Sequence, residues 1–273
     1  MQAIGSSYQN FNIHSTPKNN VAFGRKPVED DKTEKLAISA GALGVASLFL
    51  QKAAEFLATK LLNGEEFTSP DNVKKVADSM LQKNKLKGIV QVAYIDHKNK
   101  FQFGPNLAQS LETVANGQNA FYMDELKLSN GKNFKLAVAP MSKPSLILHE
   151  LGHAINSSKG PFMRFLQKSR RWATFVPTAL TALIMLHGLS KDDKDGNQNF
   201  VKKNAGLIGF AAFAPTIVEE GMASLRGINA AKVANLGKSA NLNILKRNYA
   251  LAWGTYLLAG IGLGIAAKQS VME

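Results

Sequence analysis

The chain has 273 residues, no cysteine and a formal net charge of +13 at pH 7. This length suits one large domain or two small ones. The absence of cysteine excludes disulfides, cysteine-ligated zinc and a thiol nucleophile. The positive charge is typical of proteins that contact nucleic acid, anionic lipid or the cytoplasmic face of a membrane. No nucleic-acid-binding motif supports the first option, so we expect membrane lipid, and no nucleic acid, as a partner.

The N-terminal residues differ in composition from the rest of the chain. Residues 1–33 are rich in Ser, Asn, Gly and Lys and lack hydrophobic periodicity, which predicts a disordered tail and no signal peptide. We expect residues 34–273 to form one membrane-embedded domain. Its membrane helices are predicted at about 36–51, 172–189, 205–218 and 249–267.

The length of each apolar segment decides how well it fits a bilayer. A spanning helix needs roughly 20 apolar residues, and segments 172–189 and 249–267 come close to this length. Segment 36–51 fits less well. Segment 205–218 is short and contains Pro215, which leaves open whether it spans or re-enters. Buried helices in a soluble protein are the alternative for the whole set.

The distribution of Lys and Arg predicts an orientation in the membrane. If all four segments span, residues 52–171 and 219–248 share one side, and the 190–204 loop lies on the other. The basic residues near the membrane ends of the shared side are Lys159, Arg164, Lys168, Arg170, Arg171, Arg226, Lys232, Lys238, Lys246 and Arg247. The positive-inside rule therefore predicts that the shared side is cytoplasmic.

Residues 63–144 are predicted to form a soluble region with a small sheet. Ser69 is a suitable N-cap and Pro70 suits a first helical turn, so a helix is expected to begin there. Strands are expected over 87–96, 101–104, 119–123 and 134–139. The second of these would pair with the first after a turn, and Asn130-Gly131 would close a hairpin before the last. The expected fold class is mostly α with a small β-sheet (α+β).

The stretch SLILHELGHAINSS (145–158) reads as a helix that carries two histidines and a glutamate. His149 and His153 are one helical turn apart on the same face, where two imidazoles can bind one zinc ion. Glu150 is offset by one residue, so its carboxylate lies beside the metal and can act as a general base. The alternative is a helix with two partly exposed histidines, because the bare pattern also occurs by chance.

A catalytic zinc usually has three protein ligands, and the third is expected in a helix over 215–233. Pro215 can open this helix, and Glu220 then shares one face with small residues that leave room for the histidine helix. Glu219 points about 100° away around the helix, so we expect it to support the site from outside or to lie on the surface. An acidic first turn favoured by the helix dipole is the alternative for both glutamates.

Two short motifs resemble those of the membrane-bound gluzincins. HELGHAI (149–155) is followed downstream by Glu220-Gly-Met-Ala-Ser224-Leu-Arg226, and GQNAF (117–121) resembles the strand segment that these families place before the zinc helix. The similarity covers roughly residues 115–235 and is to HtpX-type proteases, CAAX-prenyl proteases and YugP-like neutral zinc metallopeptidases. The HtpX-type pattern usually has Asp where this chain has Ser224, whereas the YugP-like pattern has Ser followed by Arg.

The resemblance implies a multi-helix, membrane-embedded zincin that acts as a zinc-dependent metalloendopeptidase with its site at the cytoplasmic membrane surface. A site at this level suggests peptide or protein substrates that include membrane proteins. His149, His153 and Glu220 carry over as ligands of one Zn²⁺ ion, and Glu150 as the general base toward zinc-bound water. Asn119 carries over as a residue of the strand that holds the substrate.

Some roles and functions stay open at this point. Arg226 would orient Glu220 or stabilise the tetrahedral intermediate, with a basic residue at the membrane interface as the alternative. The whole protein could instead be a catalytically inactive zincin-fold scaffold or partner-binding protein, or a basic lipid-binding protein with a fortuitous motif. Neither the substrate nor the oligomeric state follows from the sequence.

Overall fold

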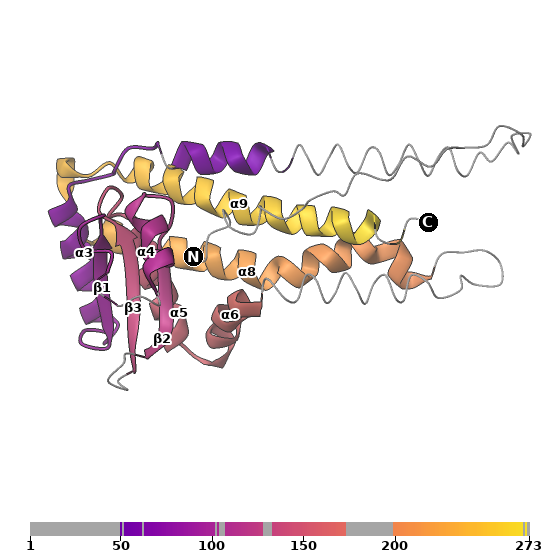
Figure 1. The fold of residues 1–273 in the computed structure, drawn as a ribbon, viewed down its shortest axis with the longest axis horizontal. Helices are drawn as coiled ribbons and strands as arrows, with labels where there is room; N and C mark the ends of the chain where they lie inside the picture. The colour runs from indigo at the N-terminus through magenta and orange to yellow at the C-terminus, as the bar shows by residue number, and fades with distance from the viewer. Residues whose placement is uncertain are drawn as a thin grey trace, which may run out of the picture.

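The computed structural model describes residues 50, 52–61, 63–101, 103, 107–127, 133–172, 199–269 and 271 (Figure 1). The tail predicted at 1–33, and nearly all of the helices predicted at 36–51 and 172–189, lie outside these residues. Within them the chain is mostly helical with one small mixed sheet, which confirms the predicted α+β class.

The sheet contains β1 (Val90–Ile95), β2 (Phe121–Lys127) and β3 (Asn133–Pro140) in the order β1-β3-β2. β2 and β3 pair in antiparallel fashion, as the predicted hairpin requires, with Phe121 opposite Val138. Their connection lies outside the described residues. β2 therefore forms one edge of the sheet, and β3 lies in the centre.

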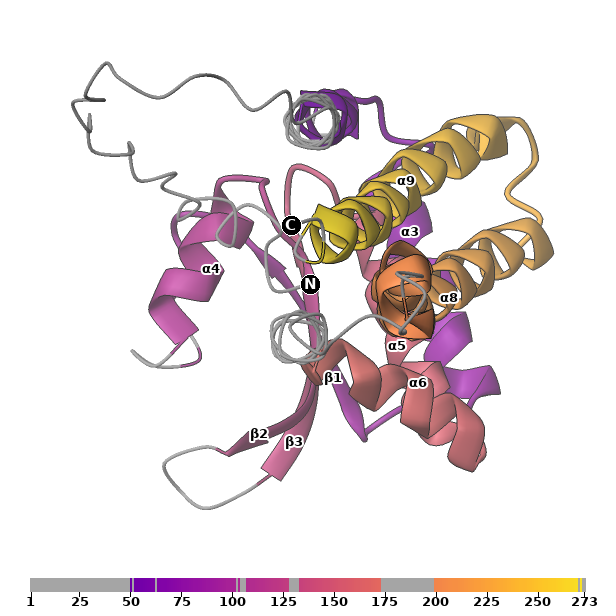
Figure 2. The ribbon, with the colours of Figure 1, turned by 90° about the vertical axis from the view of Figure 1, so that its right-hand side faces the viewer.

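The first strand pairs differently from the prediction. β1 runs parallel to β3, with Val90 opposite Lys135. The predicted pairing of 101–104 with β1 is wrong, because Phe101 and Phe103 lie in a turn. Parallel neighbours need a long crossover connection rather than a tight turn. Here the connection from β1 to the hairpin includes helix α4 (Ala108–Ala115), which covers one face of the sheet (Figure 2).

Side chains alternate across β3 and so divide the core into two layers. Leu136 belongs to the layer under α4, whereas Ala137 belongs to the layer shared with α3 (Pro70–Lys83) and α5 (Leu146–Ser158). The start of α3 is as predicted: the side chain of Ser69 accepts a hydrogen bond from the backbone N–H of Asn72, and Pro70 occupies the first turn. The short side chain at position 137 allows α5 to pack closely on the sheet.

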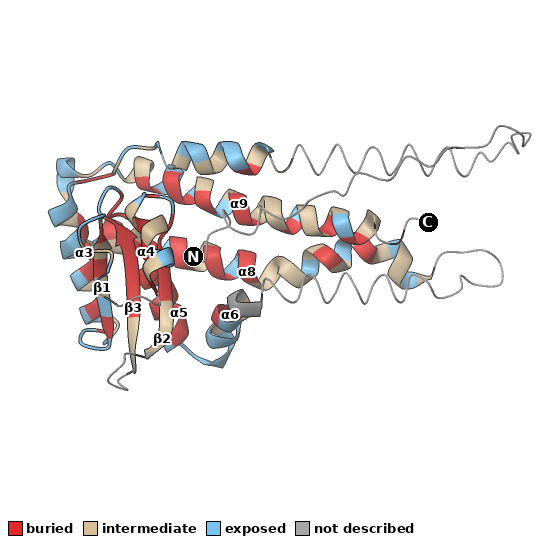
Figure 3. Ribbon diagram, viewed as in Figure 1, coloured by how far each residue is buried: buried red, intermediate tan, exposed pale blue. Residues whose placement is uncertain are grey.

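Helix α5 is buried on all sides from Ile147 to Ser157 (Figure 3). The sheet covers one side of it, and helix α8 (Phe200–Val233) packs on another. α6 (Pro161–Trp172) follows two residues after α5 and contacts both α5 and α8. The polar residues of α5 are consequently removed from water and must be satisfied by partners within the protein.

Helices α8 and α9 (Leu242–Gln269) pack against each other along their length and extend away from the sheet (Figure 1). α8 begins at an N-cap, Asn199, whose side chain accepts from the backbone N–H of Lys202. The prediction that Pro215 opens a new helix is wrong, because this residue lies inside α8. A proline within a helix removes one backbone hydrogen bond. The helix nevertheless continues through this position while it packs against α5 and α9.

One stretch of the described chain, Gly237–Gln269, is long and apolar enough to cross a membrane. It contains the predicted segment 249–267, and 33% of its most apolar part is buried against the rest of the protein. The predicted segment 205–218 lies within α8. It is not long and apolar enough to count as a candidate membrane span, since Lys203 and Glu219 flank it closely. Its insertion into a membrane stays a prediction.

Candidate metal centre

The site is assembled where α5 crosses α8, and a glycine permits the crossing. A Cβ atom at Gly152 would lie 2.3 Å from the carbonyl oxygen and 2.7 Å from the Cα of Ala223. A second glycine on α8 helps, because a Cβ at Gly227 would lie 3.1 Å from the carbonyl oxygen of Leu148. Only residues without side chains let the two backbones come this close. The histidines of α5 therefore face the glutamates of α8 directly.

Three side-chain atoms converge at this crossing. Nε2 of His149 lies 3.0 Å from Nε2 of His153 and 3.1 Å from Oε2 of Glu220, and the third separation, His153 Nε2 to Glu220 Oε2, is 3.5 Å. Two ligands at about 2.05 Å from a tetrahedral zinc ion are about 3.3 Å apart. The triangle therefore has the size that a three-ligand zinc site needs, and all three residues are buried.

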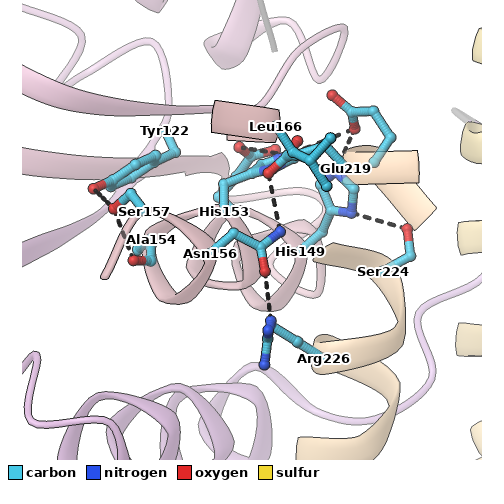
Figure 4. Close-up of polar contacts among 12 residues, drawn as sticks. Tyr122, His149, His153, Ala154, Asn156, Ser157, Leu166, Glu219, Ser224 and Arg226 are labelled. Carbon is cyan, nitrogen blue, oxygen red and sulfur yellow. Dashed lines mark hydrogen bonds and ion pairs between the residues drawn. The ribbon is translucent and has the colours of Figure 1, made fainter. Parts of the chain in front are cut away.

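The outer ring nitrogens of both histidines have oxygen partners (Figure 4). Nδ1 of His153 lies 2.8 Å from Oε1 of Glu219, and Nδ1 of His149 lies 3.0 Å from Oγ of Ser224. When Glu219 is ionised its carboxylate only accepts, so Nδ1 of His153 is then the donor and its Nε2 carries a lone pair. The Ser224 hydroxyl can accept in the same way and favours the same tautomer of His149. Three electron-pair donors then point at one spot, an arrangement that a bound cation stabilises.

Glu219 is held by a further chain of hydrogen bonds. The amide Nδ2 of Asn156 donates to Oε1 of Glu219 at 3.0 Å, and Nε of Arg226 donates to Oδ1 of Asn156 at 2.5 Å (Figure 4). Burial lowers the pKa of Arg226, while attraction to Glu219 acts in the opposite direction. Because the guanidinium occupies the amide oxygen, the amide nitrogen must face the carboxylate. The chain from Arg226 to His153 thus fixes the orientation of one imidazole.

This chain decides between the two alternatives that the sequence left for Glu219. The surface position is wrong and the supporting role is confirmed, because Glu219 is fully buried and contacts the outer nitrogen of His153. Arg226 donates to Asn156 and so acts on Glu219 through this amide, while a role in orienting Glu220 stays a prediction. The cause is the long continuous α8, which presents both glutamates to α5 at once, Glu220 toward Nε2 and Glu219 toward Nδ1 of the same ring.

Glu150 lies beside the triangle. It is fully buried, and its Oε2 is 4.0 Å from Nε2 of His153. His149, Glu150 and His153 form one group of side chains able to hold a metal ion, and His153, Glu219 and Glu220 form another. The distances separate their roles, because Glu220 reaches both inner nitrogens within 3.5 Å while Glu150 stays one step further out. A carboxylate in that position can accept a proton from a molecule bound at the triangle.

Two residues at the site were not anticipated from the sequence. Asn156 follows His153 by three positions and lies on the same side of the helix, so helical spacing could have indicated it. Tyr249 comes from α9: its ring meets His149 edge-on with centroids 5.6 Å apart, and its hydroxyl donates to the carbonyl oxygen of Ser145 at 2.7 Å. No local pattern links Tyr249 to the motif, because the contact depends on how α9 packs.

The predicted substrate residue lies near the edge strand. Asn119 is buried and precedes β2 by two residues. β2 is joined to α5 through Tyr122, whose hydroxyl lies 3.1 Å from Oγ of Ser157 and donates to Asp124 at 2.8 Å. Among the described residues β2 is an edge strand, and this contact ties it to the helix that carries the histidines. Its use by a substrate stays a prediction.

Comparisons with known proteins add no identification. No protein-family model matches the chain, no curated protein matches it, and no solved structure matches it. The buried histidine and glutamate clusters, which could hold a metal ion, are therefore the basis for assigning a function.

Proposed function

We propose that the protein is a zinc-dependent metalloendopeptidase. The observation that carries this proposal is the triangle of Nε2 of His149, Nε2 of His153 and Oε2 of Glu220, with edges of 3.0, 3.1 and 3.5 Å. Its size suits zinc, its donor set of two imidazoles and one carboxylate is that of a catalytic zinc site, and three ligands leave one position for water or substrate. Glu150 beside it provides the base that hydrolysis needs.

Each side chain has a task in this reaction. A bound zinc ion supplies Lewis acidity, which activates water and polarises a peptide carbonyl. Glu150 takes the proton from the attacking water and passes it to the nitrogen of the leaving amine, so no other acid is required for that step. Glu219 and Ser224 hold the imidazoles in the tautomer that presents Nε2, which preserves the geometry while charge redistributes.

The membrane placement of this site is also a proposal. The apolar stretch Gly237–Gln269 has only a third of its apolar window buried, whereas the core helix of a soluble protein would be mostly covered. The excess of Lys and Arg near the membrane ends favours the cytoplasmic side for the metal centre. Substrates would then be peptides or proteins at the membrane surface, membrane proteins included.

A second function is supported by a separate observation. His149, Glu150, His153 and Glu220 are all buried, as expected for a metal that only stabilises a fold. The protein would then be a zincin-like scaffold that binds a partner without hydrolysing it. Metal content alone does not separate the two functions, because both require an occupied site.

The test therefore combines metal content with hydrolysis in the full-length protein. Wild type, Glu150→Gln and Glu65→Gln are purified in detergent, zinc is measured, and cleavage of fluorescent casein is followed. Glu65 is exposed, lies outside the sheet and the helices of the site, and serves as the matched control. We expect one zinc in all three and a loss of about 10²- to 10⁴-fold in cleavage for Glu150→Gln only.

Three results decide against the proposal. Cleavage that survives in Glu150→Gln would exclude this residue as the base. A full equivalent of zinc without cleavage by the wild type would favour the scaffold. A zinc content below about a tenth of an equivalent, which added zinc does not raise, would show that the buried cluster is not a metal site.

A further inference from the structure

Helix α6 exposes aromatic side chains beside the metal centre. Phe162 and Phe165 are 68% and 61% exposed, although they lie on a well-formed helix that packs against α5 and α8. The opposite side of α6 is buried through Leu166 and Gln167. Single exposed apolar residues are common on soluble proteins, but two phenylalanines one turn apart form an apolar stripe.

The same outer surface is basic. Arg164 and Lys168 are exposed between and beside the two phenylalanines, and exposed Lys159 precedes the helix. The sequence of α6, PFMRFLQKSRRW, contains four basic residues and no acidic one. Alternating aromatic and basic side chains on one helix face are typical of helices that lie in the interface of an anionic membrane. A peptide-binding groove would not need this charge.

The position of α6 agrees with that of a membrane surface. It lies beside α8 where the part of the molecule that holds the sheet gives way to the extended α8 and α9 pair (Figure 1). Beyond this level the outer side of α8 continues to expose large apolar residues, including Phe200 at 75% and Leu207 at 67%. A bilayer that surrounds the extended pair would therefore end near the level of α6.

We propose that α6 is an interfacial helix that docks the metal centre onto a leaflet containing anionic phospholipid. Phe162 and Phe165 enter the boundary between headgroups and acyl chains, and Arg164 and Lys168 bind the headgroup phosphates. This proposal rests on the proposed membrane placement. It adds that the metal centre is held at a fixed distance from the membrane surface. Peptide bonds close to the membrane surface are then the ones that reach the metal.

The absence of native cysteine makes a direct test possible. Phe165→Cys is labelled with a nitroxide and the full chain is placed in nanodiscs of phosphatidylcholine, with or without phosphatidylserine. Collision with oxygen reports lipid and collision with a nickel chelate reports water. Lys75→Cys, on the exposed side of α3, is the aqueous reference, and Ile261→Cys, on the exposed side of α9, is the membrane reference.

We expect the label at 165 to show intermediate depth, between the two references, and to move deeper when phosphatidylserine is present. Adding Arg164→Gln and Lys168→Gln should abolish the dependence on phosphatidylserine, since each basic residue strengthens binding to an anionic surface about fivefold.

If the label at 165 collides only with the nickel chelate while that at 261 lies in lipid, the proposal of a docking helix is wrong and the membrane placement stands. If both labels are aqueous, the membrane placement itself fails. Protection of 165 from both reagents would show that a protein surface covers α6, and equal depth in both lipids would exclude recognition of anionic lipid.

Discussion

Gly152 provides the sharpest test of how the site is built. Replacing it by alanine adds one methyl group, which would lie 2.3 Å from the carbonyl oxygen of Ala223 where ordinary contact begins near 3.4 Å. The obstacle is backbone rather than the end of a flexible side chain, so the two helices must separate by about 1 Å. A zinc site tolerates errors of only about 0.2 Å in its bond lengths.

Two separate losses follow from Gly152→Ala. Overpacking of this kind costs about 1–3 kcal/mol, and the rigid obstacle places the expected cost in the upper half of that range. A loss of 2–3 kcal/mol corresponds to a fall in melting temperature of roughly 4–12 °C for a chain of this size. The displaced ligands should weaken zinc binding by about 10- to 100-fold, as occurs when ligands lose their orientation.

The matched control is Gly262→Ala on α9. A Cβ atom there meets nothing within 4 Å. Alanine is the better helix former, so this variant should match or exceed the wild-type stability by up to about 1 kcal/mol. Both variants are melted in detergent and titrated with zinc against a chromophoric chelator. If Gly152→Ala melts at or above the wild-type temperature and binds zinc equally well, the close crossing of α5 and α8 does not position the ligands.

Four further outcomes are expected. Glu219→Ala removes the acceptor for Nδ1 of His153 and should weaken zinc binding about 10- to 100-fold in the same titration. Arg226→Ala acts on Glu219 only through the side-chain amide of Asn156, so its loss of zinc affinity should stay below about tenfold. This loss should vanish in the Glu219→Ala background. A chelator should lower the unfolding free energy by about 2.7 kcal/mol if zinc had been present at about 100 times its Kd. Asp124→Asn should cost about 1 kcal/mol at pH 7 because it weakens the hydrogen bonds that join β2 to its neighbours.

The pH dependence of the Asp124→Asn effect on stability follows from the direction of the pKa shift of Asp124. Burial acts to raise the pKa of Asp124, but hydrogen bonds from Lys135 and Tyr122 outweigh it, and the folded pKa lies below the usual 3.8. The stabilisation is therefore complete above the unfolded pKa and is lost as the pH falls through the folded value. Wild type and Asp124→Asn should converge in stability below about pH 4, measured by denaturant unfolding. A difference that stays constant in acid would exclude this carboxylate as its source.

The zinc titrations and the chelation experiment each have an outcome that would contradict the prediction. Unchanged affinity in Glu219→Ala would mean that the orientation of His153 is set elsewhere. Additive losses in the double variant with Arg226→Ala would show two independent effects rather than one chain of hydrogen bonds. A melting temperature indifferent to chelation would mean that the buried donors hold no ion in the purified protein.

The local elements of this protein could be predicted because their signals are local. The Ser69 cap, the helix at 145–158 and the antiparallel pair before it depend on capping, periodicity and turn residues within a few positions. The spacing of His149 and His153 places two imidazoles on one face of any helix that forms there. The same spacing argument also singled out Glu220.

The tertiary structure decided what depends on packing between distant segments. The parallel pairing of β1 and the position of Pro215 inside α8 arise because sheet order and helix length follow contacts that no short window contains. Glu219 was expected outside the metal contacts, but its partner on His153 is visible only once α8 has crossed α5 at Gly152. The sequence by itself thus determined the chemistry available, two imidazoles and a cluster of carboxylates. The close approach of two backbones decided which of those carboxylates meets which nitrogen.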